Sequence, residues 1–331
     1  MGYKISIVPA NLQFEADDLD DVLSAALNSG INLPHGCKSG NCGACKCKVI
    51  SGEINHSDDI LPSTLSMDEF QDGYRLICQS YANSNAVIEL NGFTNQLPIK
   101  TLPSKLISIN KTGTTAVVKL QLPPSQKFEF YPGQYIDVIY KDQARSYSIA
   151  SSPNKENQID LHIRFRTNGI FSEAVFTELE IGSIIRFKGP LGSFTLNDES
   201  EKDLLFVCTG TGFAPIKSIM DSMIEAGNQR KAHLIWGNVK ADDFYLTETL
   251  AYYQDKLNLD VTLCLSEDSQ SGYYSGLVTD LLVEKHHDLA NYQLYACGNP
   301  KMVESAYDLA KNKLNLQSED FFSDSFTPSG K

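Results

Sequence analysis

The sequence lacks any apolar run near the ~20 residues that a membrane-spanning helix needs. Its first residues, MGYKISIVPANLQFEADD, contain no basic segment followed by an apolar stretch, so they predict no secretory signal peptide. Positive charge is also scarce, because 28 Lys and Arg stand against 41 Asp and Glu, for a net charge of −13. These deficits predict a soluble cytoplasmic protein that binds neither membranes nor nucleic acid.

Histidine is sparse too, and the six histidines fall in no motif that would indicate nucleophilic or hydrolytic catalysis. Cysteine, by contrast, is concentrated: four of the eight cysteines lie in the stretch HGCKSGNCGACKCKVISG at residues 35–52. A chain of 331 residues can bury ample cores and needs no disulfides for stability. In a cytoplasmic protein, such a cluster more often binds metal or does redox chemistry.

The spacing of these cysteines narrows the choice of metal. Cys37, Cys42 and Cys45 form the pattern C-x4-C-x2-C, and Cys78 follows after 32 intervening residues. This spacing is typical of four thiolates that hold a 2Fe-2S cluster. Zinc is the alternative, although structural zinc sites usually combine two short cysteine pairs. We expect Cys47 to be a packing residue, and we expect three glycines to let backbone N–H groups approach sulfur: Gly36, Gly40 and Gly43.

The residues around the cysteines predict a small α+β domain. The expected elements are a hairpin of 3–8 and 12–15, a helix within 20–30, and strands at 46–50 and 86–92. Asp20 is the expected N-cap of the helix, and Gly30 is expected to end it. Together with the cysteine spacing, this pattern resembles plant-type ferredoxins over residues 1–93. The resemblance implies a β-grasp fold that carries the cluster.

A polar segment with prolines, 94–103, is the expected linker to a second domain at 104–199. There the sequence has six short strands rich in β-branched or apolar residues: 104–110, 115–121, 134–139, 146–150, 159–165 and 184–188. Six such strands predict a closed antiparallel β-barrel.

Two segments of this barrel carry groups that suit a flavin dinucleotide. RSYSIASSP supplies Arg145, Tyr147 and Ser148, and TNGIFSEAVF supplies Gly169 and Ser172 at an expected helix start. An arginine and a helix N-terminus can bind phosphate, and a tyrosine ring can lie on an aromatic ring. The alternative is an ordinary barrel strand with exposed polar residues.

From about residue 200 the pattern changes to alternating strands and helices, which predicts a doubly wound parallel sheet over 200–331. The strand DLLFVC, the turn TGTGFAP and the helix IKSIMDSMIEAG follow one another directly. Gly210 and Gly212 would let a pyrophosphate approach the backbone near the helix N-terminus. The turn departs from the GxGxxG fingerprint because Pro215 stands at its last position. CGNP at 297–300 should line the ligand crevice at the strand ends.

The four motifs R-x-Y-S, G-x-x-S, G-T-G-F-A-P and C-G-x-P occur in this order along the chain. This arrangement resembles the ferredoxin-NADP reductase superfamily, fused here to an N-terminal ferredoxin. The resemblance implies FAD as cofactor and these roles: Arg145 on the flavin pyrophosphate, Tyr147 on the isoalloxazine, Ser148 near its N5, and Ser172, with Gly169, capping the pyrophosphate.

The same resemblance implies a nicotinamide dinucleotide on Gly210, Thr211 and Gly212, with Cys297 and Gly298 beside its nicotinamide ring. The C-terminal FFSDSF is similar to the terminal aromatic segment of the family, in which Phe326 would cover the flavin and Asp324 would stand close by. The alternative for this segment is a packed C-terminal strand. After the strand AHLIWG, the segment NVKADDFY has a single lysine, Lys240, and no arginine for a 2′-phosphate, so we expect NADH rather than NADPH.

These cofactors predict an enzyme that converts a two-electron hydride into single electrons for a redox partner protein. Within the family the sequence is most similar to reductases that serve a pyridoxamine-phosphate dehydrase in 3,6-dideoxyhexose synthesis. The segments that carry this similarity are GQYIDVIYKDQARSYSIASSP, CTGTGFAPIKSIM and FFSDSFTPSGK. The runner-up is the reductase component of an aromatic-ring dioxygenase or a multicomponent monooxygenase. A non-enzymatic zinc or nucleotide-binding protein is the alternative from a different class.

Overall fold

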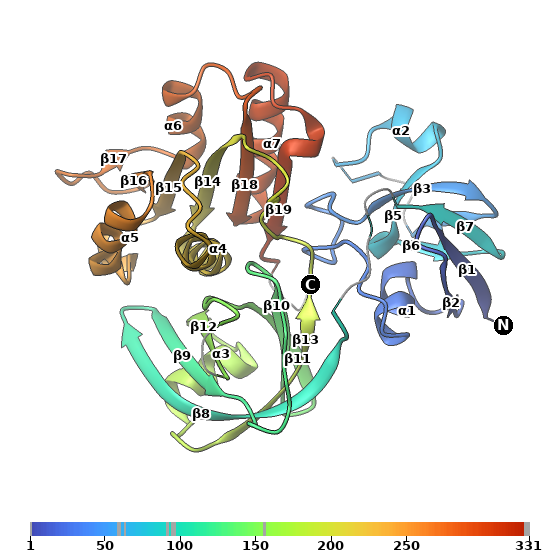
Figure 1. The fold of residues 1–331 in the computed structure, drawn as a ribbon, viewed down its shortest axis with the longest axis horizontal. Coiled ribbons are helices and arrows are strands. Elements are labelled where there is room, and N and C mark those ends of the chain that lie inside the picture. Colours follow the sequence, from blue (N-terminus) through green and yellow to red (C-terminus); the bar gives the residue numbers. More distant parts are fainter. Residues whose placement is uncertain are drawn as a thin grey trace.

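The structure, a computed structural model, describes residues 2–57, 61–62, 64–90, 93, 97–154 and 157–327. In it the chain forms three sheet-based parts in sequence order (Figure 1). Part of the expected linker, residues 94–96, lies outside the described residues, as do the last four residues. None of the helices in these ranges combines the length and the apolar character that a bilayer crossing requires.

The first part contains a five-stranded mixed sheet in the order β2-β1-β7-β3-β5 and a separate two-stranded sheet, β4-β6. Its strands and helices are β1 (Tyr3–Val8), β2 (Leu12–Ala16), α1 (Val22–Asn28), β3 (Lys46–Ser51), β4 (Ile54–His56), α2 (Met67–Gln71), β5 (Tyr74–Leu76), β6 (Ser80–Ala82) and β7 (Ala86–Glu89). β1 pairs with β7 in parallel and with β2 antiparallel. This arrangement of a mixed sheet with a packed helix confirms the ferredoxin-like α+β fold.

Helix α1 begins one residue later than the sequence indicated. The N-cap is Asp21, not Asp20, because the Asp21 carboxylate accepts hydrogen bonds from Ser24 N at 2.9 Å and from Ser24 Oγ at 2.6 Å. Two adjacent aspartates offer equivalent caps, and the sequence alone does not rank them. Gly30 follows the helix with a positive φ of 79°, as the expected helix end requires.

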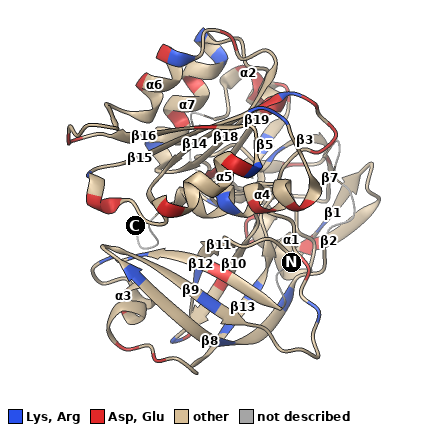
Figure 2. Cartoon of the chain, turned by 60° about the vertical axis from the view of Figure 1, so that its left-hand side comes forward, with Lys and Arg blue, Asp and Glu red and all other residues tan. Residues whose placement is uncertain are grey.

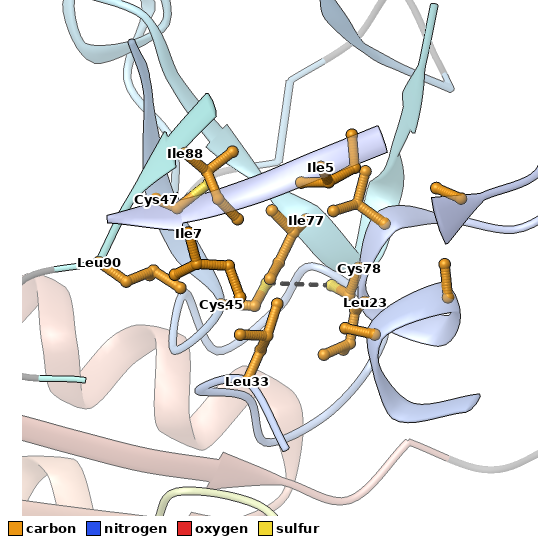
Figure 3. Packing of buried hydrophobic residues seen from close by; sticks show 14 of the residues in the cluster. Ile5, Ile7, Leu23, Leu33, Cys45, Cys47, Ile77, Cys78, Ile88 and Leu90 are labelled. Atoms are coloured by element: carbon orange, nitrogen blue, oxygen red, sulfur yellow. Dashed lines mark hydrogen bonds between the residues drawn. The ribbon is translucent and has the colours of Figure 1, made fainter. Parts of the chain in front are cut away.

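The core of this part combines alternating apolar residues of β1 with the cysteine segments. Ile5 and Ile7 are fully buried, and Cys47 is packed in the same cluster. Figure 3 shows Cys45 and Cys78 facing each other within it. Cys47 therefore packs as expected from its position in a strand.

The second part is a six-stranded antiparallel sheet in the order β11-β10-β13-β8-β9-β12. Its elements are β8 (Lys100–Thr112), β9 (Thr115–Gln121), β10 (Tyr135–Tyr140), β11 (Gln143–Ser148), β12 (Gln158–Arg164), α3 (Ile170–Thr177) and β13 (Ile184–Leu191). An isolated antiparallel β-bridge pairs Ile149, which directly follows β11, with Leu161 in β12. The bridge thus connects the two edge strands of the sheet. The antiparallel barrel is therefore confirmed, and its first strand starts at Lys100.

The third part is a six-stranded parallel sheet in the order β17-β16-β15-β14-β18-β19. Its elements are β14 (Asp203–Thr209), α4 (Phe213–Ala226), β15 (Ala232–Asn238), α5 (Leu250–Lys256), β16 (Leu259–Leu265), β17 (Tyr274–Ser275), α6 (Val278–Lys285), β18 (Tyr292–Gly298), α7 (Pro300–Lys313) and β19 (Phe321–Ser325). Alternate residues of β14 pack under α4 and α5 on one face and under α6 and α7 on the other. This is the expected doubly wound sheet.

The three parts meet along the last strand. β19, at the edge of the third sheet, lies next to the ferredoxin-like part and above the barrel (Figure 1). Figure 2 shows Asp and Glu recurring on the helices of the third part, whereas Lys and Arg recur on barrel strands.

Candidate cluster and nucleotide sites

The cysteine loop brings four thiols together in two pairs. Cys45 Sγ lies 3.2 Å from Cys78 Sγ, and the Cys37 thiol is hydrogen-bonded to that of Cys42. Among the residues that the structure describes, no three His, Cys, Asp or Glu side chains converge on a single point. The thiols converge two by two instead, as two irons with two thiolates each would require.

Hydrogen bonds in the loop favour the thiolate form of one cysteine. The contact with the Cys42 thiol, together with Ser39, lowers the pKa of Cys37 to about 5, while the same contact raises the pKa of Cys42. The Ser39 N–H lies 3.4 Å from Cys37 Sγ. Iron ligation requires thiolates, so a donor placed on sulfur suits a cluster ligand.

Two loop glycines have the backbone conformation that explains their presence, since Gly40 and Gly43 have φ of 78° and 73°. Gly36 is needed for a different reason. A Cβ there would lie 3.0 Å from Ser323 O and 3.3 Å from Cys42 Sγ. A side chain at Gly36 would therefore push the cysteine loop away from β19.

A cavity of about 800 Å³ lies between the barrel, β19 and the cysteine loop. All residues that the sequence assigned to the flavin line it: Arg145, Tyr147, Ser148, Gly169 and Ser172. The wall also includes Gly36, Cys37, Lys38 and Ser39 from the cysteine loop, and Asp324, Ser325 and Phe326 from the C-terminal segment. One cavity thus contacts both the expected flavin residues and a cysteine ligand.

The lining fits a flavin nucleotide. Ser148 Oγ is buried and has no hydrogen-bond partner within the described part of the chain. Gly169 is the N-cap of α3, and a Cβ there would lie 2.2 Å from Ser172 Oγ. The Tyr147 ring lies 5.5 Å from that of Phe171, and burial raises the pKa of Tyr147 to about 12, so its phenol stays protonated. A flavin nucleotide needs a hydrogen-bond donor near its isoalloxazine ring, which Ser148 can supply. It also needs groups that bind phosphate, which Arg145 and the N-terminus of α3 can supply.

A second cavity of about 610 Å³ lies at the carboxyl ends of β14, β15 and β18. Gly210, Thr211 and Gly298 line it, as expected for a dinucleotide site. Gly212 lies behind the wall, where a Cβ would be 2.2 Å from Cys297 O, so glycine lets the start of α4 contact β18. The Cys297 side chain is fully buried in the core and lines neither cavity, so the structure does not bring its thiol to the expected nicotinamide position.

The C-terminal segment joins the two cavities. Phe326 lines both, and its N–H donates to Gly298 O at 2.7 Å. Asp324 lines the first cavity, and burial raises its pKa to about 7. A carboxyl group with this pKa can hold or release a proton near neutral pH. The segment FFSDS forms the strand β19, so the alternative of a packed C-terminal strand holds as well. Phe326 directly follows this strand and lies where the two cavities meet.

Sequence reasoning missed a row of side chains on β12 and the loop that follows it. His162, Arg164 and Arg166 all line the first cavity, and the two arginines also line the second. Their spacing of two residues in HIRFR places them on one face of an extended chain. This alternation was the feature of the sequence from which the row could have been predicted. Arg164 Nη2 lies 3.3 Å from Asp243 Oδ1.

Asn238, at the end of β15, was missed as well. Its side chain is 6% exposed, lines the second cavity, and has neither amide atom hydrogen-bonded within the described residues. A buried amide without partners is costly, which indicates a place for a ligand hydroxyl or phosphate. Lys240, by contrast, is exposed and lies outside both cavities.

Three family models match the chain in the order of its sheets. They are a 2Fe-2S iron-sulfur cluster binding domain at residues 5–83, an oxidoreductase FAD-binding domain at 104–196 and an oxidoreductase NAD-binding domain at 206–308. These matches confirm the three expected cofactors: a 2Fe-2S cluster, FAD and NAD(H).

Full-length relatives fall into two groups. A CDP-6-deoxy-L-threo-D-glycero-4-hexulose-3-dehydrase reductase from Yersinia pseudotuberculosis is 34% identical, over 99% of this chain and 100% of that protein. The reductase component of a propane 2-monooxygenase from Mycolicibacterium goodii is 32% identical, over 98% and 97%. Among solved structures, a cytochrome P450 reductase from Amycolatopsis matches with a TM-score of 0.80 at 25% identity, over 99% of this chain and 100% of that one.

The paired thiols generate a prediction about the cluster. We expect Cys42→Ser to abolish the visible absorption of the 2Fe-2S cluster and electron delivery to a partner protein, because one iron loses a thiolate. Reduction of ferricyanide by NADH should persist, since flavin alone can serve that acceptor. Iron and sulfide analysis with absorption spectra checks this. Cys47→Ala is the matched control and should retain both properties; an unchanged iron content in Cys42→Ser would contradict the ligand assignment.

The position of Phe326 between the cavities generates a second prediction. We expect Phe326→Ala to retain FAD but to change the rate of flavin reduction by NADH about tenfold, equivalent to ~1.4 kcal/mol in the barrier. The discrimination between NADH and NADPH should change as well, because a ring that covers the isoalloxazine must be displaced by the nicotinamide. Stopped-flow absorption measures the rate. The control is Phe322→Ala, whose ring stacks on Tyr295 at 4.6 Å and lines neither cavity. Equal flavin reduction rates in Phe326→Ala and the wild type would show that Phe326 is a packing residue.

Proposed function

The chain belongs to the ferredoxin-NADP reductase superfamily, in the branch fused to an N-terminal 2Fe-2S ferredoxin, and we propose that it reduces a pyridoxamine-phosphate dehydrase of CDP-3,6-dideoxyhexose synthesis. It is an NAD(P)H-dependent oxidoreductase, and its activity would be that of a CDP-6-deoxy-Δ3,4-glucoseen reductase. The observation that carries this proposal is the end-to-end similarity to a dehydrase reductase. Its free thiols suit a cytoplasmic location.

In this proposal the three functions follow the three parts of the chain: ferredoxin at 1–93, FAD domain at 100–199 and NAD domain at 200–331. The linker is shorter than the expected 94–103, because β8 already begins at Lys100. Flavin takes up both electrons of a hydride and releases them singly, which suits a one-electron acceptor. Cys37 and Cys42 hold one iron, and Cys45 and Cys78 hold the other.

The remaining residues bind and orient the two nucleotides. Arg145 and the N-terminus of α3, with Gly169 and Ser172, hold the FAD pyrophosphate. Tyr147 flanks the isoalloxazine, and Ser148 donates a hydrogen bond to it. The turn Gly210–Gly212 and Gly298, at the end of β18, receive the nicotinamide dinucleotide, while the Cys297 side chain packs in the core behind them. Phe326 covers the flavin on the side of the second cavity, and Asp324 can exchange a proton near it.

The shared wall of the first cavity supports direct electron passage inside the chain. Cys37 and Lys38 line the same cavity as Tyr147 and Ser148. A flavin held there would meet the cysteine loop without an intervening domain. The redox partner then has to approach only the ferredoxin part.

A second candidate acceptor is an oxygenase component. The propane monooxygenase reductase has nearly the same identity as the dehydrase reductase, and it too is matched over almost its full length. The partner is in either case a protein that takes single electrons. Only the identity of that protein separates the two candidates.

Reconstitution tests the acceptor. We expect this protein, NADH, the pyridoxamine-phosphate dehydrase and CDP-4-keto-6-deoxyglucose, mixed without oxygen, to yield the 3,6-dideoxy sugar. Omission of this protein should abolish the product, because the dehydrase-bound intermediate then receives no electrons. No product, combined with reduction of an oxygenase component and substrate-dependent oxygen uptake, would assign the chain to the second candidate.

The lining of the second cavity generates a prediction about the coenzyme. The residues Asn238 and Val239 at the end of β15 are uncharged, so they supply no positive charge for a 2′-phosphate. Arg164 and Arg166 do line the cavity, but Arg164 is paired with Asp243. We expect a higher kcat/KM for NADH than for NADPH, measured with ferricyanide. Asn238→Ala should lower kcat/KM for NADH about tenfold through lost hydrogen bonds. A preference for NADPH would contradict the coenzyme proposal, and an unchanged Asn238→Ala would remove this residue from the site.

A further inference from the structure

A fully buried histidine lies where the cysteine loop meets the barrel, and the proposed chemistry gives it no task. His35 Nδ1 lies 2.6 Å from Leu33 O, and Nε2 lies 2.8 Å from the Tyr135 hydroxyl. A carbonyl oxygen can only accept, so Nδ1 carries the proton of the neutral ring. Nε2 therefore accepts, and the Tyr135 phenol is the donor.

Tyr135 belongs to both sides of this contact. It is the first residue of β10, in register with Ser148 of the flavin-binding strand β11. Its ring nevertheless packs with the core cluster of the ferredoxin-like part, and only 4% of the residue is exposed. The side chain that contacts His35 thus lies directly beside the strand that lines the flavin cavity.

Backbone and charged groups extend the same contact. The His35 N–H donates to Ser193 Oγ at 3.0 Å, and the Ser193 N–H donates to His35 O at 2.9 Å. Lys38 Nζ lies 3.0 Å from Asp137 Oδ2 and 5.1 Å from the centre of the Tyr135 ring. The Lys38 side chain is 33% exposed, so water screens the ion pair. Water does not reach the His35–Tyr135 bond, which makes that bond the costliest to leave unmade.

A second set of contacts holds the loop on its other side. Ser323 Oγ donates to Cys42 O at 2.9 Å, and Ser39 Oγ lies 2.9 Å from Thr327 Oγ1. Ser323 and Thr327 both belong to the C-terminal segment that contains Phe326. If that segment shifts when a nicotinamide enters, these contacts shift with it. The contact with the barrel is independent of the segment.

We propose that the His35–Tyr135 hydrogen bond is the positioning element that keeps the cysteine loop docked on the flavin-binding barrel. Its consequence for catalysis rests on the proposed cofactor placement. A cluster held by Cys37, Cys42, Cys45 and Cys78 would accept electrons one at a time from a flavin held in the first cavity, and the partner protein would reoxidise it between the two transfers. The hydrogen bond carries no electron; it keeps the separation of donor and acceptor constant during both transfers.

Hydrogen exchange of the holoprotein measures this docking directly. Tyr135→Phe keeps the ring and removes the donor, which leaves Nε2 of His35 buried without its partner. We expect the opening constant for the amides of His35 and Ser193 to rise about tenfold, equivalent to ~1.4 kcal/mol. Tyr253→Phe is the matched control, because it removes a buried hydroxyl that donates to Asp221 within the third part. Unchanged exchange at His35 and Ser193 in Tyr135→Phe would overturn the proposal.

Stopped-flow absorption separates docking from nucleotide binding. Ser193 lines neither cavity, so in Ser193→Ala the reduction of flavin by NADH should keep its rate and KM, whereas the subsequent bleaching of the cluster should slow. Tyr135→Phe should slow the same bleaching, although Tyr135 itself lines the first cavity. Equal slowing of both phases in Ser193→Ala would overturn the proposal, because the contact would then act through the flavin site. Neither measurement contains a partner protein, so a failed reconstitution with the dehydrase leaves these results unaffected.

Discussion

The close approach of the cysteine loop to two other parts of the chain is the constraint on which the rest of the structure depends. The loop must lie against the barrel at Tyr135 and against β19 at Ser323, with no side chain at Gly36 to separate them. Electron transfer inside a protein needs its donor and acceptor close together, and here Cys37 lines the same cavity as the residues that we expect to hold the flavin. Each of the three parts has its own sheet, but the cavity exists only where all three parts meet.

Local patterns in the sequence predicted most of the fold. The cysteine spacing, the alternation of apolar residues in the barrel and the strand-helix alternation after residue 200 each depend on neighbours along the chain. The residues that line the flavin cavity were found in the same way, since Arg145, Tyr147 and Ser148 lie on one strand. The sequence was less informative where two neighbouring residues could fill the same role, as Asp20 and Asp21 could as N-cap of α1. It was also less informative where the direction of a side chain determines whether a residue reaches a site. Cys297 has the expected position on β18, but its thiol points into the core under α4.

Contacts between the parts could not be read from the sequence. His35 and Tyr135 are 100 residues apart, and the sequence segments that contain them give no sign that the two side chains are in contact. Asn238 is a single asparagine at a strand end, which is a common turn residue, so only its burial without partners marks it. HIRFR was different, because its alternation of polar residues on an otherwise buried strand was visible and could have indicated that β12 faces a cavity.

The last strand has a consequence for how the protein is made. Ser323 bonds to Cys42 across a separation of 281 residues, and Phe326 lies at the junction of the two cavities. A ribosome releases the ferredoxin-like part long before these residues leave its exit tunnel. The cluster loop therefore has one side open throughout synthesis, when assembly factors can still reach its cysteines. Completion of the chain then brings Ser323 against that side of the loop.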